Sequence, residues 1–222
     1  MIMRKLQHFG RIQLARLLNE AAVGRFPPAD GGVTILPQPS QRDSGVFGFT
    51  AHAVICTDAD PDWVVSQLPP DDLNGPLSPP FLQALCAATD RTAGSIDVLC
   101  AAGPLAGPSP LDLTPEPDSA HPRVARALKY RDEVQAWRTD GGVVLLGRGI
   151  AGRWETAIEV DEDRRGHGLG RRLASAARHL VPPGTPLWAQ VAPANAASLR
   201  PFLAAGFAPV GAEVLLARNS EP

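Results

Sequence analysis

The feature that most constrains the fold is a glycine-rich segment between a strand-like run and a helix-like run. Residues 164–172 read RRGHGLGRR, with three glycines and four arginines. The preceding WETAIEV (154–160) alternates as a strand does, and the helical pattern near 168–180 gathers leucines and alanines on one face. A strand that leads directly into a helix is typical of layered α/β proteins.

The composition of the loop indicates what it binds. The first N–H groups of a helix have no partner within the helix, and the helix dipole is positive at that end. Glycines lack a Cβ, so these amides can curve closely around an anion. The sequence therefore predicts a phosphate-binding loop, with Arg164, Arg165, Arg171 and Arg172 adding positive charge. The alternative interpretation is a simple glycine turn with solvated arginines.

Two nucleotide-binding motifs fit this loop less well. A dinucleotide fingerprint needs G-x-G-x-x-G within a parallel sheet, whereas the glycines here are Gly166, Gly168 and Gly170 after an apparent meander. A Walker A loop ends in Gly-Lys-Ser/Thr, and the chain has no such tripeptide.

The other elements alternate between helices and strands along the whole chain. Residues 103–122 are proline-rich and predict a linker between an N-terminal α/β portion (1–102) and a C-terminal portion (123–222). Helices are expected at roughly 4–23, from Pro61, at 79–89, 123–129, 168–180 and 198–205, and strands at 31–39, 45–57, 95–102, 132–137, 141–149, 153–160, 187–191 and 212–218.

Bulk composition excludes several classes of protein. The net charge of −2 and 44% hydrophobic content over 222 residues do not suggest a general nucleic-acid or membrane binder. No apolar run reaches the roughly 18–20 residues of a spanning helix, and no signal-peptide core is evident. Cys56, Cys86 and Cys100 are scattered without metal-ligand spacing, as in a reducing cytoplasm. The arginine-rich composition suggests a GC-rich bacterial genome, and the oligomeric state, monomer or homodimer, stays open.

Two blocks of sequence together resemble one family. Arg165-Gly166-His167-Gly168-Leu169-Gly170 closely resembles the [Gln/Arg]-x-x-Gly-x-[Gly/Ala] signature of the GNAT (GCN5-related) N-acetyltransferase superfamily. The segment VAPANAASLRPFLAAGF (191–207) is similar to the closing segment of the same family, and the blocks follow in the family's order. The resemblance implies a mixed, mostly antiparallel sheet flanked by helices, with acetyl-CoA as co-substrate, no metal, and the residues 1–102 as an added portion or a degenerate half of the same kind.

The resemblance also implies a set of residues that bind the coenzyme. The loop amides would take the pyrophosphate, and the end of the strand at 158–160 would hold the pantetheine arm where it diverges from the strand 187–191. Asn195 would bond the pantetheine amides, although it could equally be a simple helix cap. The complete implied set is Ile158, Glu159, Val160, Arg165, Gly166, His167, Gly168, Leu169, Gly170, Arg171, Asn195, Ser198 and Phe202.

The sequence departs from the family at the proton-transfer positions. Many relatives place a tyrosine acid where this chain has Phe202, and some place a glutamate base where it has Gln190. Neither side chain titrates. The only tyrosine is Tyr130, outside the motif. The nearest carboxylates, Glu155 and Glu159, share one face of a strand, toward the solvent or an acceptor cleft, and are candidate bases, with ion pairing to nearby arginines as the alternative.

The position of Pro201 bears on where the last helix begins. A proline inside a helix costs about 3 kcal/mol, whereas in the first turn its missing N–H costs little. The sequence therefore favours a helix capped by Ser198 over one that begins at Asn195. His52 and His179 lie within regular elements and are expected to be structural.

Together these features predict an N-acyltransferase that moves an acetyl group from acetyl-CoA to a primary amine of a small molecule or peptide. The alternative is a non-catalytic acyl-CoA-binding regulator or sensor of the same fold, which the residues Phe202 and Gln190 favour.

Overall fold

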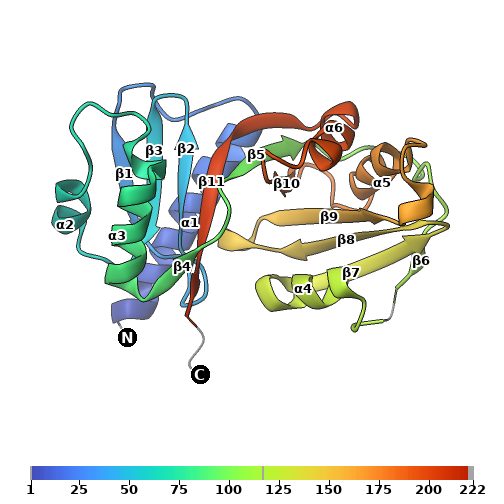
Figure 1. Ribbon diagram of the computed structural model, residues 1–222, viewed down its shortest axis with the longest axis horizontal. Helices are drawn as coiled ribbons and strands as arrows, with labels where there is room; N and C mark the ends of the chain where they lie inside the picture. Colours follow the sequence, from blue (N-terminus) through green and yellow to red (C-terminus); the bar gives the residue numbers. More distant parts are fainter. Residues whose placement is uncertain (1, 117, 220–222) are drawn as a thin grey trace. The chain divides into compact units, whose positions relative to one another are not determined.

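The computed structural model describes residues 2–116 and 118–219 (Figure 1). The chain forms two compact units, one of residues up to Val98 together with those from Val210, and one of Leu99–Pro209. The boundaries fall inside strands β5 (Asp97–Ala102) and β11 (Ala208–Arg218). This division groups the last strand with the N-terminal residues, whereas the sequence-based division grouped it with the C-terminal portion.

The first unit is a small α/β layer. β1 runs parallel to β3, β3 and β2 form a hairpin, and β11 lies antiparallel to both β2 and β4. Its elements are α1 (Ile2–Ala22), β1 (Val33–Pro37), β2 (Gly45–Phe49), β3 (His52–Thr57), α2 (Pro61–Ser66), the 3₁₀ turn η1 (Gly75–Leu77), α3 (Pro79–Thr89) and β4 (Arg91–Ala93).

Apolar side chains and one arginine hold this unit together. Val46, Ile55 and Val214 from its strands pack against Phe81 and Leu85 of α3. Burying these side chains stabilises the unit by about 1.5–3 kcal/mol each before conformational entropy is counted.

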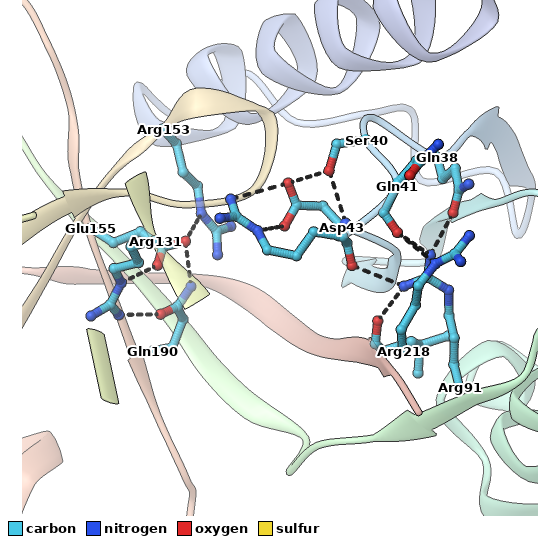
Figure 2. A network of polar contacts seen from close by, with 12 residues as sticks. Gln38, Ser40, Gln41, Asp43, Arg91, Arg131, Arg153, Glu155, Gln190 and Arg218 are labelled. Atoms are coloured by element: carbon cyan, nitrogen blue, oxygen red, sulfur yellow. Dashed lines mark hydrogen bonds and ion pairs between the residues drawn. The ribbon is translucent and has the colours of Figure 1, made fainter. Parts of the chain in front are cut away.

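Arg91 joins the loop before β2 to the last strand (Figure 2). Its guanidinium is buried, and it donates to the carbonyl oxygens of Arg42, Gln41 and Leu216 at 2.8–2.9 Å and to Gln38 Oε1 at 2.7 Å. Burial lowers the pKa of Arg91. These contacts are all within the unit, so Arg91 has a structural role.

The second unit is a mixed sheet in which most strand pairs are antiparallel. β6 to β9 pair antiparallel in sequence order, β10 runs parallel to β9, and β5 lies beyond β10. Its elements are β6 (Thr114–Pro115), α4 (Pro122–Tyr130), β7 (Asp132–Thr139), β8 (Gly142–Arg148), η2 (Ile150–Gly152), β9 (Trp154–Val160), η3 (Glu162–Arg164), α5 (Leu169–Ala177), β10 (Leu187–Val191) and α6 (Ala196–Ala204).

Helices cover both faces of the second unit's sheet. α5 and α6 lie on one face of β8–β10 and α4 on the other (Figure 1). The strand alternation explains this, because Val160 of β9 lies on the side of Gly170 in α5, whereas Glu155 and Glu159 meet arginines from the region of α4. The buried face of α5 carries Leu169, Leu173, Ala174, Ala176 and Ala177.

The proline-rich segment 103–113 is a strap along α5. The carbonyl oxygens of Gly103, Gly107 and Pro110 accept from Arg178 Nε (2.8 Å), His179 Nδ1 (3.1 Å) and Arg172 Nη2 (3.3 Å). Because both the strap and α5 belong to Leu99–Pro209, the strap lies within one compact unit. Next, β6 adds a short edge strand to β7.

Most expected elements are confirmed within a few residues, with two differences. The run 45–57, expected as one strand, is two strands joined at Thr50–Ala51, where Ala51 takes a φ of +50°. β4 and β6 were missed because strands this short carry little periodic pattern. Asp60 caps α2 as expected, accepting from Trp63 N at 3.0 Å.

Candidate functional site

The glycine-rich loop adopts a backbone that needs glycine at two positions. Gly166 and Gly168 both have a φ of +79°, and Gly168 is the N-cap of α5. This left-handed conformation is unfavourable for most side chains. A Cβ at either position would meet nothing within 4 Å, so the space in front of the loop is open. The backbone is therefore accessible to a ligand at both glycines.

The same loop presents a run of unpaired donors. Within the described residues, the backbone N–H groups from Gly166 to Arg171 have no acceptor, and the first bond of α5 runs from Arg172 N to Gly168 O at 3.3 Å. Amides at a helix N-terminus carry the positive end of the helix dipole. The loop can therefore accept an anion with several negative oxygens.

The arginines around the loop divide into anchored and unanchored groups. Arg164 pairs with Asp140 at 2.6 Å, and Arg165 Nε donates to Val160 O at 3.2 Å. Arg171 and His167 are exposed and have no hydrogen-bond or ion-pair partner among the described residues. The loop is thus fixed at its base by Arg165, while the side chains nearest the free amides face solvent.

The pairing between β9 and β10 ends before the loop, and the unpaired stretch of β9 that this leaves is called the gap below. The two parallel strands share only two register pairs, Trp154 with Leu187 and Glu155 with Trp188. On its other edge, β9 pairs with β8 along its whole length. The edge of β9 from Ala157 to Val160 therefore has no strand partner on the β10 side. The resemblance implied this divergence, and the structure contains it.

A buried charged cluster lies where the two strands part (Figure 2). Glu155, which is 3% exposed, accepts from Arg131 Nε at 2.7 Å and from Arg153 Nε at 2.8 Å. Gln190 of β10 donates its Nε2 to Glu155 Oε1 at 2.7 Å and accepts from Arg131 Nη2 at 3.2 Å. Both carboxylate oxygens of Glu155 are therefore occupied.

The surroundings of Glu155 make its carboxylate a weak base. Burial raises the pKa of Glu155, but the charges and hydrogen bonds of Arg153 and Arg131 outweigh burial and lower it to about 2. The carboxylate also lies against Gly149, where a Cβ would come within 2.0 Å of Oε1. The cluster thus holds Glu155 ionised in a fixed position.

The expected orientation of the two glutamates is only partly right. They do share a face of β9, but α4 and its flanking arginine cover that face, so Glu155 does not point to solvent. Glu159 is half-buried and pairs with Arg123 Nε of α4 at 2.9 Å. Ion pairing with nearby arginines, the alternative that the sequence left open, is present for both glutamates. The sequence did not single out Arg123 and Arg131, because these partners are distant along the chain.

The start of α6 differs from the expectation. α6 begins at Ala196, and Asn195 is its cap, with Oδ1 accepting from Ser198 N at 3.0 Å. Pro201 therefore lies inside the helix, contrary to the expected start at Ser198. Its ring lies over Gly170, where a Cβ would come within 3.3 Å of it. Helices α5 and α6 therefore approach each other closely at Pro201, although a proline inside a helix is unfavourable.

Other residues singled out from the sequence occupy structural positions. Phe202 is buried and packs edge-on against Phe207 with ring centroids 5.1 Å apart. Tyr130 is exposed at the end of α4. His52 bridges Asp30 and Thr34 at 2.9 Å each. Among the described residues, no group of three or more His, Cys, Asp or Glu could hold a metal ion.

The helices and the cysteines have two further properties. Across residues 2–116 and 118–219, no helix has both the length and the apolar character needed to cross a membrane. Cys56, Cys86 and Cys100 are free thiols, and burial raises the pKa of Cys56 to about 12.

Comparison with known proteins gives weak similarities to one family. No protein-family model and no curated protein matches the chain. Among solved structures, it is similar to a GCN5-related N-acetyltransferase from Kribbella flavida, with 18% identity, a TM-score of 0.40 and coverage of 63% of this chain and 64% of that one. It is also similar to a GNAT-family acetyltransferase from Colwellia psychrerythraea, with 14% identity, a TM-score of 0.38 and coverage of 62% and 61%.

The matched part spans less than two thirds of either structure's length. Because both TM-scores lie below 0.5, the functional proposal rests on the loop, the gap and the sequence motifs.

Proposed function

We propose that this protein is an acetyl-CoA-dependent N-acyltransferase that acetylates a primary amine of a small molecule or peptide. One observation carries the proposal. In the part of the chain that the structure describes, the N–H groups from Gly166 to Arg171 have no acceptor, and they follow β9, whose last residues have no partner in β10. A diphosphate that carries a long amide-containing chain needs hydrogen-bond donors for its phosphates and an unpaired strand edge for the amides of the chain.

The residues present fit such a co-substrate. Gly166 and Gly168 leave open space where side chains would stand, so phosphate oxygens can approach the amides. Arg165 and Arg171 would add charge, and the free edge of β9 at 158–160 would bond the pantetheine amides. Asn195 and Ser198 stand at the start of α6, and Asn195 Nδ2, which has no acceptor among the described residues, is a further donor. When bound, acetyl-CoA supplies a thioester carbon open to attack by an amine.

The acceptor amine must lose a proton before it attacks, since an alkylammonium has a pKa near 10. Glu155 is a poor base for this purpose because its pKa is about 2 and both oxygens are bonded. Glu159, paired to a single arginine and half-buried, is the better candidate among the two. A thiolate leaving group of pKa about 8–9 needs no dedicated acid, because water can protonate it.

A second candidate function is a non-catalytic acyl-CoA-binding sensor. Specific observations favour it, since Gln190 is engaged with Glu155 and Phe202 is buried against Phe207. Neither position therefore offers a titrating group to a substrate.

One experiment separates the two functions. Thiol release from acetyl-CoA is followed at steady state over a panel of polyamines, amino acids, aminoglycosides and peptide amines, with acetyl-CoA binding measured in parallel by calorimetry. Binding with amine-dependent thiol release supports the acyltransferase. Binding without release over the whole panel supports the sensor, and absence of binding contradicts both.

A further inference from the structure

Helix α1 packs on the sheet of the first unit with one face, on the far side of this sheet from α3 (Figure 1). Gly10, Leu14 and Leu18 are buried on that face. A Cβ at Gly10 would come within 2.0 Å of the carbonyl oxygen of Pro37 in β1, so helix and strand touch there. None of the residues 3–9 is buried. The packing of α1 therefore begins at Gly10, and the preceding turns extend beyond it.

The rest of α1 exposes large apolar side chains. Four of them, each between 49% and 66% exposed, are Met3, Leu6, Phe9 and Ile12. A helix that packs on a sheet with one face normally carries polar residues on the other. Exposed apolar side chains that gather on one element mark a surface that meets an apolar partner.

The same part of α1 is cationic. Residues 3–19 contain no Asp or Glu, and their four cationic side chains are Arg4, Lys5, Arg11 and Arg16. All four are exposed and have no ion-pair partner within residues 2–116 and 118–219. The first carboxylate of the helix, Glu20, is paired with Arg25. The net charge of −2 for the whole chain conceals this local excess of positive charge.

Apolar and cationic side chains share one row along the exposed face. The row consists of Lys5, Phe9, Ile12 and Arg16, which are separated by four, three and four residues. A long cationic side chain can lay its methylene stem along an apolar surface and keep its charged end at the polar boundary. The row therefore fits a surface in which an apolar layer lies beneath a layer of anionic groups.

This chemistry favours an anionic lipid bilayer over other partners. Acyl chains can take up the apolar side chains of such a helix, and anionic headgroups attract its cations. A nucleic acid offers phosphates but no apolar layer for Phe9 and Ile12. A second copy of the chain, in a two-fold contact through this face, would bring the same cations of both helices together, which is unfavourable.

We propose that α1 binds to the surface of a bilayer that contains anionic lipids, with the row from Lys5 to Arg16 facing the lipid. The helix would lie in the plane of the surface, with its buried face still on the sheet of the first unit. This binding goes beyond the proposed function and does not depend on whether the second unit transfers an acyl group.

The test is flotation of the full-length protein with vesicles of two compositions, phosphatidylcholine alone and an equal mixture of phosphatidylcholine and phosphatidylglycerol. Phe9→Gln removes an apolar side chain from the row, and Lys5→Glu reverses a charge in it. The matched controls are Val65→Gln on α2, at a site that is 58% exposed, and Arg126→Glu on α4. Circular dichroism melting verifies that each variant is folded, and analytical ultracentrifugation measures self-association.

We expect the wild-type protein to float with the mixed vesicles and not with phosphatidylcholine alone, and added salt to weaken this binding. Lys5→Glu should bind the mixed vesicles at least about fivefold more weakly, because one cation near an anionic surface contributes about that factor. Phe9→Gln should weaken binding by a similar factor because it buries less apolar area. The two controls should bind as the wild type does.

Three results would overturn the proposal. Equal binding to both kinds of vesicle would show that charge does not select the surface. Wild-type binding by the folded Phe9→Gln and Lys5→Glu proteins would place the contact elsewhere on the molecule. If the wild-type protein does not float with the mixed vesicles, α1 does not bind anionic lipid, and self-association that Phe9→Gln reverses would identify a second copy as the partner instead.

Discussion

Gln190 and Glu155 join β9 and β10 at the place where these strands separate, with Nε2 donating to Oε1 at 2.7 Å. The last register pair is Glu155 with Trp188, and Gln190 lies two residues further along β10. The side-chain bond therefore crosses the mouth of the gap. The cluster around Glu155 therefore joins the two strands where the gap begins. We expect loss of this cluster to lower the stability of the protein.

Replacing Glu155 should destabilise the protein strongly. Glu155→Gln leaves Arg131 and Arg153 without their shared carboxylate in a buried setting. Breaking a buried ion pair on one side typically costs about 3–5 kcal/mol. Urea unfolding at pH 7 measures the loss, and Glu159→Gln, which removes a half-exposed pair, should cost about 1 kcal/mol or less. Equal losses of stability in the two variants would show that the buried cluster stabilises the protein no more than the half-exposed pair does.

The Glu155 carboxylate should account for part of the loss of stability at low pH. Its pKa is lowered from 4.5 to about 2 in the folded protein, so its stabilising contribution is complete above pH 4.5 and is lost as the pH falls toward 2. Wild-type stability should therefore decline more steeply than that of Glu155→Gln between pH 5 and pH 3, as followed by urea unfolding. The other carboxylates titrate in both proteins, so parallel curves would contradict the assignment.

Asn195 should have two separable roles. Its Oδ1 caps α6, and its Nδ2 has no acceptor within residues 2–116 and 118–219. Asn195→Ala should lower stability by about 1 kcal/mol. Asn195→Asp keeps the cap but loses the Nδ2 donor, so it should restore stability while acetyl-CoA binds several-fold more weakly in calorimetry. Wild-type affinity in Asn195→Asp would leave Asn195 as a helix cap only.

Glu159 should carry the base if the protein is an enzyme. Glu159→Gln should lower turnover roughly 10²–10⁴-fold with acetyl-CoA affinity little changed. Tyr130→Phe, at the exposed end of α4, should retain activity. Thiol release under saturating acetyl-CoA measures both. Full activity in Glu159→Gln together with loss in Tyr130→Phe would reverse the assignment.

The loop was predictable from the sequence because its determinants are local. Its signals lie within about 25 residues of each other: the glycine spacing, the flanking arginines and the change from a strand pattern to a helix pattern. Such local signals can be recognised without knowledge of tertiary contacts. The strands of the meander were predictable from the sequence for the same reason.

The remaining features depend on contacts between distant residues. The burial of Glu155 depends on Arg131 and Gln190, from other elements, as well as on the neighbouring Arg153. The prolines of 103–113 correctly predicted a segment without helix or strand. The sequence does not indicate that carbonyl oxygens of this segment accept hydrogen bonds from Arg172 and Arg178. In α6, the cap by Asn195 and the packing on Gly170 prevail over the local preference of Pro201.

The central claim is that the loop amides bind the diphosphate of acetyl-CoA, and a pair of glycine variants tests it most directly. Gly168 and Gly184 both have a left-handed φ, +79° and +76°, and a Cβ at either meets nothing within 4 Å. Gly168→Asp adds a side chain and a negative charge at the loop, whereas Gly184→Asp makes the same change in the turn before β10.

Calorimetry should show acetyl-CoA affinity at least tenfold lower for Gly168→Asp, a loss of about 1.4 kcal/mol or more. The Gly184→Asp protein should bind as the wild type does. Unchanged affinity in a folded Gly168→Asp protein would contradict the account.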